Sequence, residues 1–328
     1  MSLQRNSGTD LELDFDPARP GWLPSFLIIG AVKSATTWTL EQLQANPAIH
    51  MPDPEPHYFS SEYHRGEDYY RGFFATENTA GRLRGEKSAD YLAHPQAPAR
   101  VAAMLHDARL VAQFRNPIER AYSDYKMLYR RGTIRGAPEE YLTSLDNPHP
   151  RFLNDGLYAR HLRRWFDHFP EEQIRGVLFD DVKRHPHRVI ETISAHIGVA
   201  PVFDADEPAK RANDSSERFL PLPVRRALSP LKTVVAPLRG TRWFEATRGV
   251  FASEIAYPPL SRSLRLRLRD FYADDVEALG KMLNRDLSHW LEDRREPPPA
   301  AGRPVPDLRL ASLAAVALQC VLLDPLSG

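Results

Sequence analysis

The sequence has a single cysteine, Cys320, among its 328 residues. One cysteine cannot form an intramolecular disulfide or a thiolate cage for a metal ion, so both are excluded. Lys and Arg together number 43, and so do Asp and Glu, which leaves a formal net charge of zero. A balanced chain has no overall field that would attract nucleic acid or an anionic membrane. We therefore expect no nucleic-acid partner, and any anion site must be local.

Long apolar runs are also missing. The stretches from Phe26 to Val32 and from Leu310 to Leu323 are both shorter than the roughly 20 residues of a membrane-spanning helix. The first suits a buried strand, and the second suits a short docking or dangling helix. The chain opens with polar, acidic sequence through Asp16, so no secretory signal is visible. We expect no membrane span and a cytoplasmic location, which fits the scarcity of cysteine.

Composition divides the chain into three parts. Residues 1–24 form an irregular lead-in that ends in prolines. Residues 25–292 carry alternating strand and helix patterns, long enough for one large α/β domain or two small ones. Residues 293–328 are a proline-rich linker followed by the short apolar segment.

Strands and helices alternate along the central part. Buried strands are predicted at Phe26–Gly30, Leu110–Phe114 and Ile174–Phe179. Helical patterns cover 36–45, the stretch from Pro117 onward, 157–169, 186–197 and 264–283. In the last of these, Leu264–Arg269 alternates like a strand, but the longer helical period prevails. This alternation predicts an α/β fold of three layers, with a central parallel β-sheet flanked by helices.

The turn after the first strand has the composition of an anion-binding loop. It contains one cation, three hydroxyls and a small residue, namely Lys33, Ser34, Thr36, Thr37 and Ala35. The first amides of the following helix have no acceptor within the helix, and the helix dipole favours a negative charge there. Lys33 adds a mobile positive charge, and the hydroxyls suit phosphate oxygens. An ordinary strand-to-helix turn with a capping hydroxyl explains the same pattern equally well.

The same loop is not a Walker A motif, which requires Gly-Lys-[Ser/Thr] after an earlier glycine. Val32 precedes Lys33, and Leu27 occupies the position of the earlier glycine. A magnesium-dependent kinase or nucleotide triphosphatase is therefore disfavoured. His185 and His187 lie in a turn before a helix and suit solvated surface, so we expect no metal.

A second cation–hydroxyl pair lies further along the chain. Arg115 ends the second predicted strand, and Ser123 lies two turns into the next helix. An arginine fork and a hydroxyl can hold one phosphate above the sheet edge, where Lys33 would also lie. The alternative, which spacing alone favours, is a surface ion pair between Arg115 and Glu119.

Four segments together resemble the superfamily of sulfotransferases that use 3′-phosphoadenosine 5′-phosphosulfate (PAPS). Residues 30–37 resemble its 5′-phosphosulfate loop, and 115–125 match its 3′-phosphate element, Arg-x-Pro-x-x-Arg-x-x-Ser-x-Tyr. Residues 54–59 and 85–91 resemble the Lys-Glu-Pro-His-Phe-Phe and Glu-Lys-Ser/Thr stretches of the heparan-sulfate-type branch. The resemblance covers about residues 25–292 and implies a P-loop-like sulfotransferase domain in a soluble member of that branch.

The resemblance implies roles for the matched residues. Lys33 would bind the 5′-phosphosulfate and stabilise the leaving oxygen, and Arg115 and Ser123 would hold the 3′-phosphate. Further hydroxyl and amide donors to the phosphosulfate would come from Ser34, Ala35, Thr36 and Thr37. Glu55 would be the general base, because the acceptor hydroxyl loses its proton as the sulfur–oxygen bond forms. The candidates for binding the acceptor are His57, Lys87, Ser88 and Asp90.

The sequence departs from the branch at two positions that concern the acceptor. Pro54 stands where the branch has Lys, and Ser60 stands where some glycan-specific members have an acidic residue. PAPS use is unaffected, so we expect sulfuryl transfer by in-line displacement to a hydroxyl or amine of a carbohydrate or small molecule. A late loop around Lys210–Arg218 would cover the nucleotide. The alternatives are an ATP-dependent P-loop phosphotransferase and a non-catalytic nucleotide- or glycan-binding module on the same fold.

Overall fold

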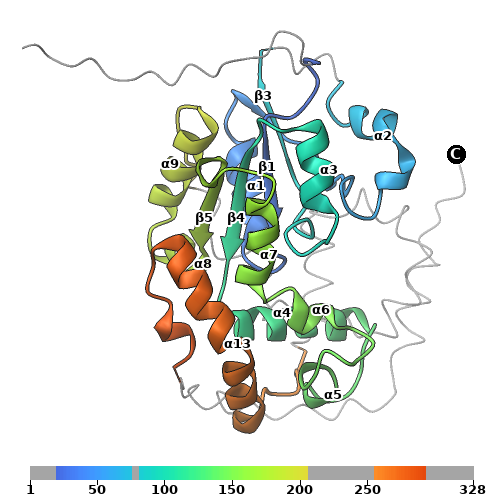
Figure 1. Ribbon diagram of the computed structural model, residues 1–328, viewed down its shortest axis with the longest axis vertical. Helices are drawn as coiled ribbons and strands as arrows, with labels where there is room; N and C mark the ends of the chain where they lie inside the picture. Colours follow the sequence, from blue (N-terminus) through green and yellow to red (C-terminus); the bar gives the residue numbers. More distant parts are fainter. Residues whose placement is uncertain (1–19, 76–80, 206–254, 293–328) are drawn as a thin grey trace, which may run out of the picture. The chain divides into compact units, whose positions relative to one another are not determined.

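The computed structural model describes residues 20–75, 81–205 and 255–292. Within them, five parallel strands form one sheet with the order β2-β3-β1-β4-β5 (Figure 1). The strands are β1 (Phe26–Gly30), β2 (Ile49–His50), β3 (Leu83–Lys87), β4 (Arg109–Phe114) and β5 (Ile174–Leu178). Because all neighbours are parallel, the loops that follow the strands gather at one edge of the sheet.

Strand β1 lies at the centre of the sheet because its sequence is apolar on both faces. All five of its residues are buried, as expected for a strand covered on both sides. Side chains alternate along a strand, so Leu27 and Ile29 enter one core cluster while Phe26 and Ile28 enter another. The sheet therefore separates two hydrophobic cores.

Helices cover both faces of the sheet. The helices of the described residues are α1 (Thr36–Gln44), α2 (Glu67–Arg71), α3 (Ala97–Met104), α4 (Pro117–Arg131), α5 (Glu139–Leu142), α6 (Arg151–Asn154), α7 (Tyr158–Phe166), α8 (Phe179–Arg184), α9 (Pro186–Ile197) and α13 (Arg262–Leu283). Short 3₁₀ turns add η1 (Tyr63–Arg65), η3 (Glu171–Gln173) and η6 (Ser288–Trp290). In the view of Figure 1, α3 and α7 lie in front of the sheet and α1 lies behind it. Helix α9 shares the core cluster of α1, and α13 packs against α7 and α4.

The predicted α/β fold with a parallel sheet between helical layers is confirmed. The predicted strand at Phe26–Gly30 has the observed bounds, and the one at Leu110–Phe114 begins one residue earlier. Phe179, predicted as the end of a strand, instead begins α8. The ambiguous segment Leu264–Arg269 is helical, as the longer period predicts.

Strand β3 is not predicted by its own sequence, Leu-Arg-Gly-Glu-Lys. Gly, Glu and Lys are depleted in strands, so local propensity gives no signal for one here. Pairing with β1, in the register Leu27↔Glu86, and with β2 forms the strand nevertheless. This strand leads directly into the Lys87-Ser88-Ala89-Asp90 stretch of the candidate site.

Several predicted segments lie outside the described residues. They are most of the lead-in, the nucleotide-covering loop at Lys210–Arg218, and the linker with its apolar segment after residue 292. The chain forms two compact units, Met1–Leu291 and Glu292–Gly328, and all described residues except Glu292 belong to the first. Among the described helices, none is long and apolar enough to cross a bilayer.

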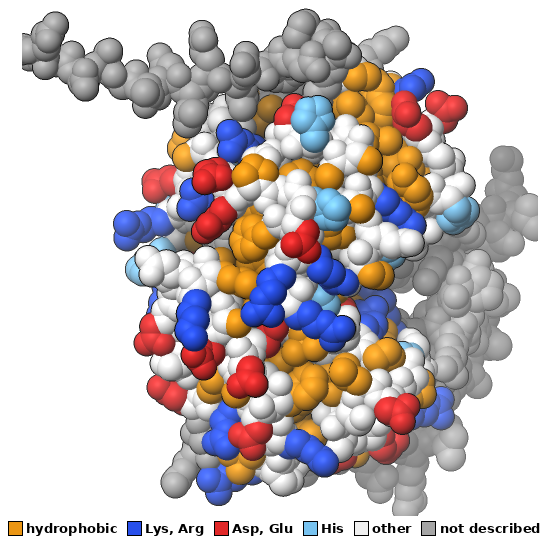
Figure 2. All heavy atoms as spheres, viewed as in Figure 1, with side chains coloured by type: hydrophobic (Ala, Val, Ile, Leu, Met, Phe, Trp, Pro, Cys, Tyr) orange, Lys and Arg blue, Asp and Glu red, His pale blue; other side chains and the backbone are white. Residues whose placement is uncertain are grey.

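The zero net charge does not mean an even distribution of charge on the surface. Lys and Arg side chains gather near the middle of the face shown in Figure 2, whereas most Asp and Glu side chains lie toward its edges. A chain with 43 cations and 43 anions therefore still presents local concentrations of positive charge.

Candidate active site

The loop between β1 and α1 turns sharply and leaves the start of α1 open. Lys33 and Ala35 adopt left-handed backbone conformations, with φ of 71° and 68°. Such conformations are costly for residues other than glycine and are frequent at ligand-binding loops. Ala35 is the N-cap of α1, and no side chain caps the helix. The alternative of an ordinary turn with a capping hydroxyl is therefore wrong, and the first amides of α1 stay available to an anion.

Gly30 lets this loop approach the end of β3 closely. Its φ is 141°, which L side chains rarely adopt, and a Cβ atom there would lie 2.6 Å from the Ala89 carbonyl oxygen. Leu92 also donates its amide to the Ile29 carbonyl at 2.7 Å. The loop after β1 and the loop after β3 are thus in direct contact at the same edge of the sheet.

Lys33 lies where its positive charge is poorly solvated. Burial lowers its pKa from 10.5 to about 8, and Asp124 opposes this while Arg130, Arg115 and Arg131 reinforce it. Its Nζ atom contacts the Met127 sulfur at 4.0 Å. A buried ammonium among several arginines is stabilised by an arriving anion.

Arg115 is brought to the same loop from the end of β4. Its Nη1 atom donates to the Lys33 carbonyl oxygen at 3.2 Å, and its guanidinium lies 4.6 Å from the Phe179 ring centroid. Glu119 pairs with Arg265 at 2.6 Å rather than with Arg115, so the alternative of an Arg115–Glu119 surface pair is wrong. Two segments separated by about 80 residues thus meet, as the sequence predicts.

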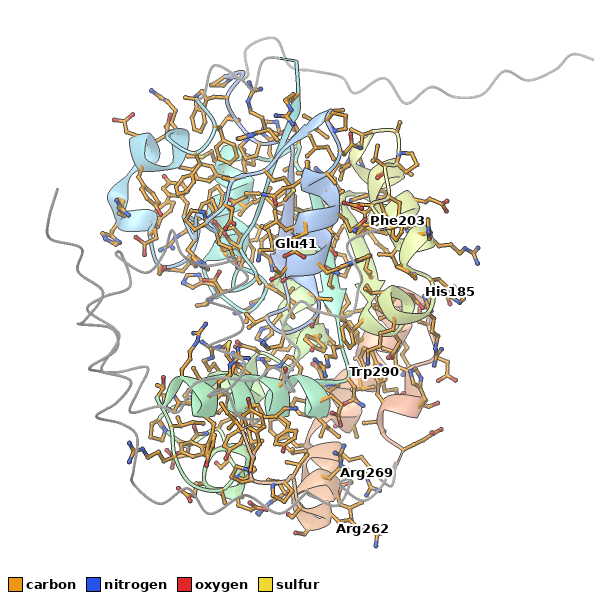
Figure 3. All side chains as sticks on the ribbon, turned by 180° about the vertical axis from the view of Figure 1, so that it is seen from behind. Glu41, His185, Phe203, Arg262, Arg269 and Trp290 are labelled. Atoms are coloured by element: carbon orange, nitrogen blue, oxygen red, sulfur yellow. The ribbon has the colours of Figure 1, made fainter. Side chains whose placement is uncertain are left out.

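The helix that follows Arg115 is capped and tied to the end of the described chain. The Asn116 side chain accepts from the amides of Ile118 and Glu119, and donates to the Trp290 carbonyl at 2.7 Å. Figure 3 shows Trp290 near the start of α4. Ser123 lies half-buried on α4, two turns beyond this cap. The cap fixes the direction in which α4 leaves the sheet edge.

Glu55 is held by two groups from the end of β3. Its Oε1 lies 2.6 Å from Lys87 Nζ, and its Oε2 accepts from the Ala89 amide at 3.1 Å. The Lys87 side chain is only 3% exposed and also lies 3.5 Å from the Thr37 hydroxyl at the start of α1. One buried ammonium therefore links the carboxylate to the anion-binding loop.

Glu55 opens on a pocket of about 360 Å³. The pocket is lined by Thr37, Leu40, Glu41, Gln44, Asp53, Pro54, Glu55, His57 and Lys87. In Figure 3, Glu41 marks the surface of α1 that forms one side of it. Four residues that the sequence analysis identifies as site candidates thus share one cavity: Thr37, Glu55, His57 and Lys87.

His57 and Asp90 form a pair beside this carboxylate. The His57 Nδ1 atom lies 2.8 Å from Asp90 Oδ1, and both side chains are about two-fifths exposed. This hydrogen bond raises the pKa of His57 above 6.5, against an opposing effect of burial. The backbone of His57 is left-handed, with φ of 51°, and its amide donates to Ser88 Oγ at 3.0 Å. Ser88 is fully buried and holds the His57 backbone from behind.

Glu86 is a site component that the sequence did not indicate. It is fully buried at the end of β3 and accepts hydrogen bonds from Tyr70, Ser88 and Tyr91. Glu86 is the glutamate of the Glu-Lys-Ser/Thr stretch in the sequence, but that resemblance gave it no role. Among the described residues, no three His, Cys, Asp or Glu side chains converge as metal ligands.

Comparisons with known proteins identify the family. The sulfotransferase domain family matches residues 23–215. Heparan sulfate glucosamine 3-O-sulfotransferase 3B1 of Mus musculus is 28% identical over 280 residues, covering 83% of this chain and 66% of that protein. Bifunctional heparan sulfate N-deacetylase/N-sulfotransferase 2 of Homo sapiens is 27% identical over 293 residues, covering 83% and 31%. The aligned part thus spans about two thirds of one relative and a third of the other.

Among solved structures, the fold resembles a sulfotransferase from Alicyclobacillus acidocaldarius. The TM-score is 0.59 with 24% identity, and the match covers 82% of this chain and 99% of that chain. This likeness supports the arrangement of the sheet and its helices.

Proposed function

The chain belongs to the sulfotransferase domain family, and we propose that it transfers the sulfuryl group of PAPS to a hydroxyl or amine of a carbohydrate or small-molecule acceptor. The observation that carries this proposal is the contact of Lys87 with both Glu55 and Thr37. It joins a proton acceptor to the start of an uncapped helix within a single pocket. Direct transfer requires both groups to act on adjacent atoms at the same time.

The described residues fit a doubly anionic adenine nucleotide. Lys33 and the open first turn of α1 would hold the 5′-phosphosulfate, where Ser34, Thr36 and Thr37 add hydroxyls. Arg115, which donates to the Lys33 carbonyl, would hold the 3′-phosphate together with Ser123. PAPS supplies the activated sulfuryl group, and these residues bind and orient it.

Glu55 would take the proton of the acceptor. Each oxygen of a carboxylate has two acceptor sites, so one remains on each oxygen after its contact with Lys87 or Ala89. As the new bond from the acceptor oxygen to sulfur forms, the bond from sulfur to the 5′-phosphate oxygen breaks. The proton passes to Glu55, and the charge that develops on the departing phosphate lies toward Lys33.

Glu55→Gln tests the assignment of the base. We expect it to abolish sulfuryl transfer while the affinity for adenosine 3′,5′-bisphosphate stays within about twofold, because general-base removal acts on the transition state. Glu62→Gln, which removes a carboxylate of similar exposure that pairs with Arg65, is the matched control and should retain activity. Sulfuryl turnover that survives in Glu55→Gln would reject Glu55 as the base.

Arg115→Ala tests the identity of the nucleotide. If Arg115 holds the 3′-phosphate, the variant should lose affinity for adenosine 3′,5′-bisphosphate and should bind ATP no more weakly than the native protein does. Tighter binding of ATP than of the bisphosphate by the native protein would instead support a phosphotransferase. The carbohydrate class of acceptor rests on the names of the two relatives, and the cytoplasmic location stays a prediction.

A further inference from the structure

Glu86 is a buried carboxylate that the proposed chemistry does not use. Its side chain is fully buried on β3, yet it accepts four hydrogen bonds from three hydroxyls. Tyr70 donates to Oε1 at 2.6 Å, and Ser88 donates to Oε2 at 2.9 Å. Tyr91 contacts both oxygens, at 3.2 and 3.3 Å. A buried carboxylate with this many donors fixes the orientation of each of them.

Two of these hydroxyls transmit that orientation to the segment that follows Glu55. Ser88 Oγ accepts the His57 amide at 3.0 Å, and the Tyr91 hydroxyl accepts the Phe59 amide at 3.2 Å. A hydroxyl has one proton, so each can accept an amide and still donate to Glu86. The carboxylate therefore orders two hydrogen-bond relays, one through Ser88 to the His57 amide and one through Tyr91 to the Phe59 amide.

The residues at the end of β3 hold two different parts of the site. Lys87 and the Ala89 amide hold the carboxylate of Glu55. Glu86 and Ser88 instead hold the backbone of His57, which has a left-handed φ of 51°. A left-handed histidine costs free energy and persists only when its surroundings impose it. The His57 amide bond to Ser88 supplies that constraint.

We propose that Glu86 is a positioning residue, whose carboxylate acts through Ser88 and Tyr91 to hold the His57 imidazole beside Glu55 in the acceptor pocket. This inference rests on the proposed function, because it assigns the acceptor side of that same site. Glu86 itself contacts neither substrate. Loss of its carboxylate releases the segment 57–59 and leaves the nucleotide loop around Lys33 intact.

The protonation state of Glu86 bears on the same contacts. Burial raises its pKa to about 7, hydrogen bonds from Tyr70, Ser88 and Tyr91 lower it, and the charge of Asp90 raises it. An ionised carboxylate only accepts, whereas a protonated one carries its own donor and competes with one hydroxyl. Acidification below about pH 7 therefore removes a hydrogen bond from the network.

The experiment compares Glu86→Gln, Ser88→Ala and Ser88→Thr with the native chain. Glu86→Gln and Ser88→Ala should each lower kcat/KM for the acceptor by about tenfold or more, with the Kd of adenosine 3′,5′-bisphosphate within about twofold. Ser88→Thr keeps the hydroxyl and should retain more of the native kcat/KM than Ser88→Ala does. Because Ser88→Ala breaks one of the two relays that Glu86 orders, the double variant should be no more impaired than Glu86→Gln alone.

A second measurement follows His57 directly and needs no turnover. The NMR titration of its imidazole is assigned by the signal missing in His57→Gln. In Ser88→Ala, the pKa of His57 should fall toward its ordinary value as the contact with Asp90 loosens. In Glu86→Gln it should fall further, because the charge of Glu86, which also raises this pKa, is removed. Asp275→Asn is the control: its half-buried carboxylate accepts the amides of Ala159 and Arg160 at the start of α7, and its loss should leave the His57 titration unchanged.

The outcomes separate this inference from the proposed function. A native chain that binds the bisphosphate but transfers no sulfuryl group would defeat the proposed function. The His57 titration would still test whether Glu86 positions His57. An unchanged His57 titration in both Glu86→Gln and Ser88→Ala would overturn the inference. So would a parallel loss of bisphosphate affinity, which indicates general damage to the fold. If Glu86→Gln does not fold, the contrast between Ser88→Ala and Ser88→Thr decides.

Discussion

Nucleotide affinity should depend on pH through the charge of Lys33. Burial lowers the pKa of this residue from 10.5 to about 8, so it loses its positive charge as the pH rises through about 8. If only the charged form binds the phosphosulfate, the competent fraction falls from about nine-tenths at pH 7 to about one-tenth at pH 9. The Kd for adenosine 3′,5′-bisphosphate should therefore rise about tenfold over this range.

Isothermal titration calorimetry measures this effect in two ways. The Kd is determined at several pH values between 7 and 9, a range in which the charge on the phosphates of the ligand is nearly constant. At about pH 8, binding should also take up about half a proton, which appears as a difference in enthalpy between buffers of different ionisation heat. Arginine stays charged throughout this range, so Lys33→Arg is the control and should show neither effect.

Two results would refute this reasoning about Lys33. The first is a Kd that stays flat from pH 7 to pH 9 in the native chain. The second is the same slope in Lys33→Arg, which would assign the titration to another group. Either result would mean that the nucleotide does not bind through a Lys33 ammonium whose pKa lies near 8.

Three further predictions concern stability. The lowered pKa of Lys33 corresponds to about 3 kcal/mol of unfavourable burial, so Lys33→Met should raise the free energy of unfolding at neutral pH, measured in urea. Lys87→Met leaves Glu55 without its charged partner and should lower that free energy by about 2 kcal/mol. The loss is smaller than for a fully buried pair because Glu55 is 28% exposed and keeps its bond from the Ala89 amide. Burial lowers the pKa of His161 to about 4. Between about pH 6.5 and 4 the unfolded chain therefore binds a proton at this residue that the folded chain does not, and the free energy of unfolding should fall as the pH drops through this range. His161→Gln should flatten that slope.

The parts of the fold predictable from sequence are those fixed by local patterns. Strand β1 is a continuous apolar run, and α4 begins with Asn116 and Pro117, a cap and a first-turn residue that favour a helix start. The meeting of Lys33 and Arg115 also follows from topology, because neighbouring parallel strands end at one edge. Local chemistry and connectivity therefore suffice to predict that the residues of the proposed nucleotide site meet.

The acceptor side depends on contacts that local patterns do not encode. The His57–Asp90 pair joins residues 33 apart in the sequence, and the hydrogen bond from Tyr70 to Glu86 joins residues 16 apart. Glu86 also lies in a strand whose residue types do not favour strand formation. The residue type of His57 does not indicate that its backbone is left-handed. These features arise from how β3 is paired and buried, which only the assembled sheet determines.

The end of β3 explains how donor and acceptor groups can be aligned by a chain with no net charge. Lys87 reaches Thr37 on one side and Glu55 on the other, and Ala89 binds Glu55 through its amide while its carbonyl packs against Gly30. The loop after β1 and the Glu55 carboxylate thus contact the same few residues at the end of β3. Under the proposed function, such contacts would keep the reacting atoms in line, and the local placement of cations, rather than their total number, would make the site selective for anions.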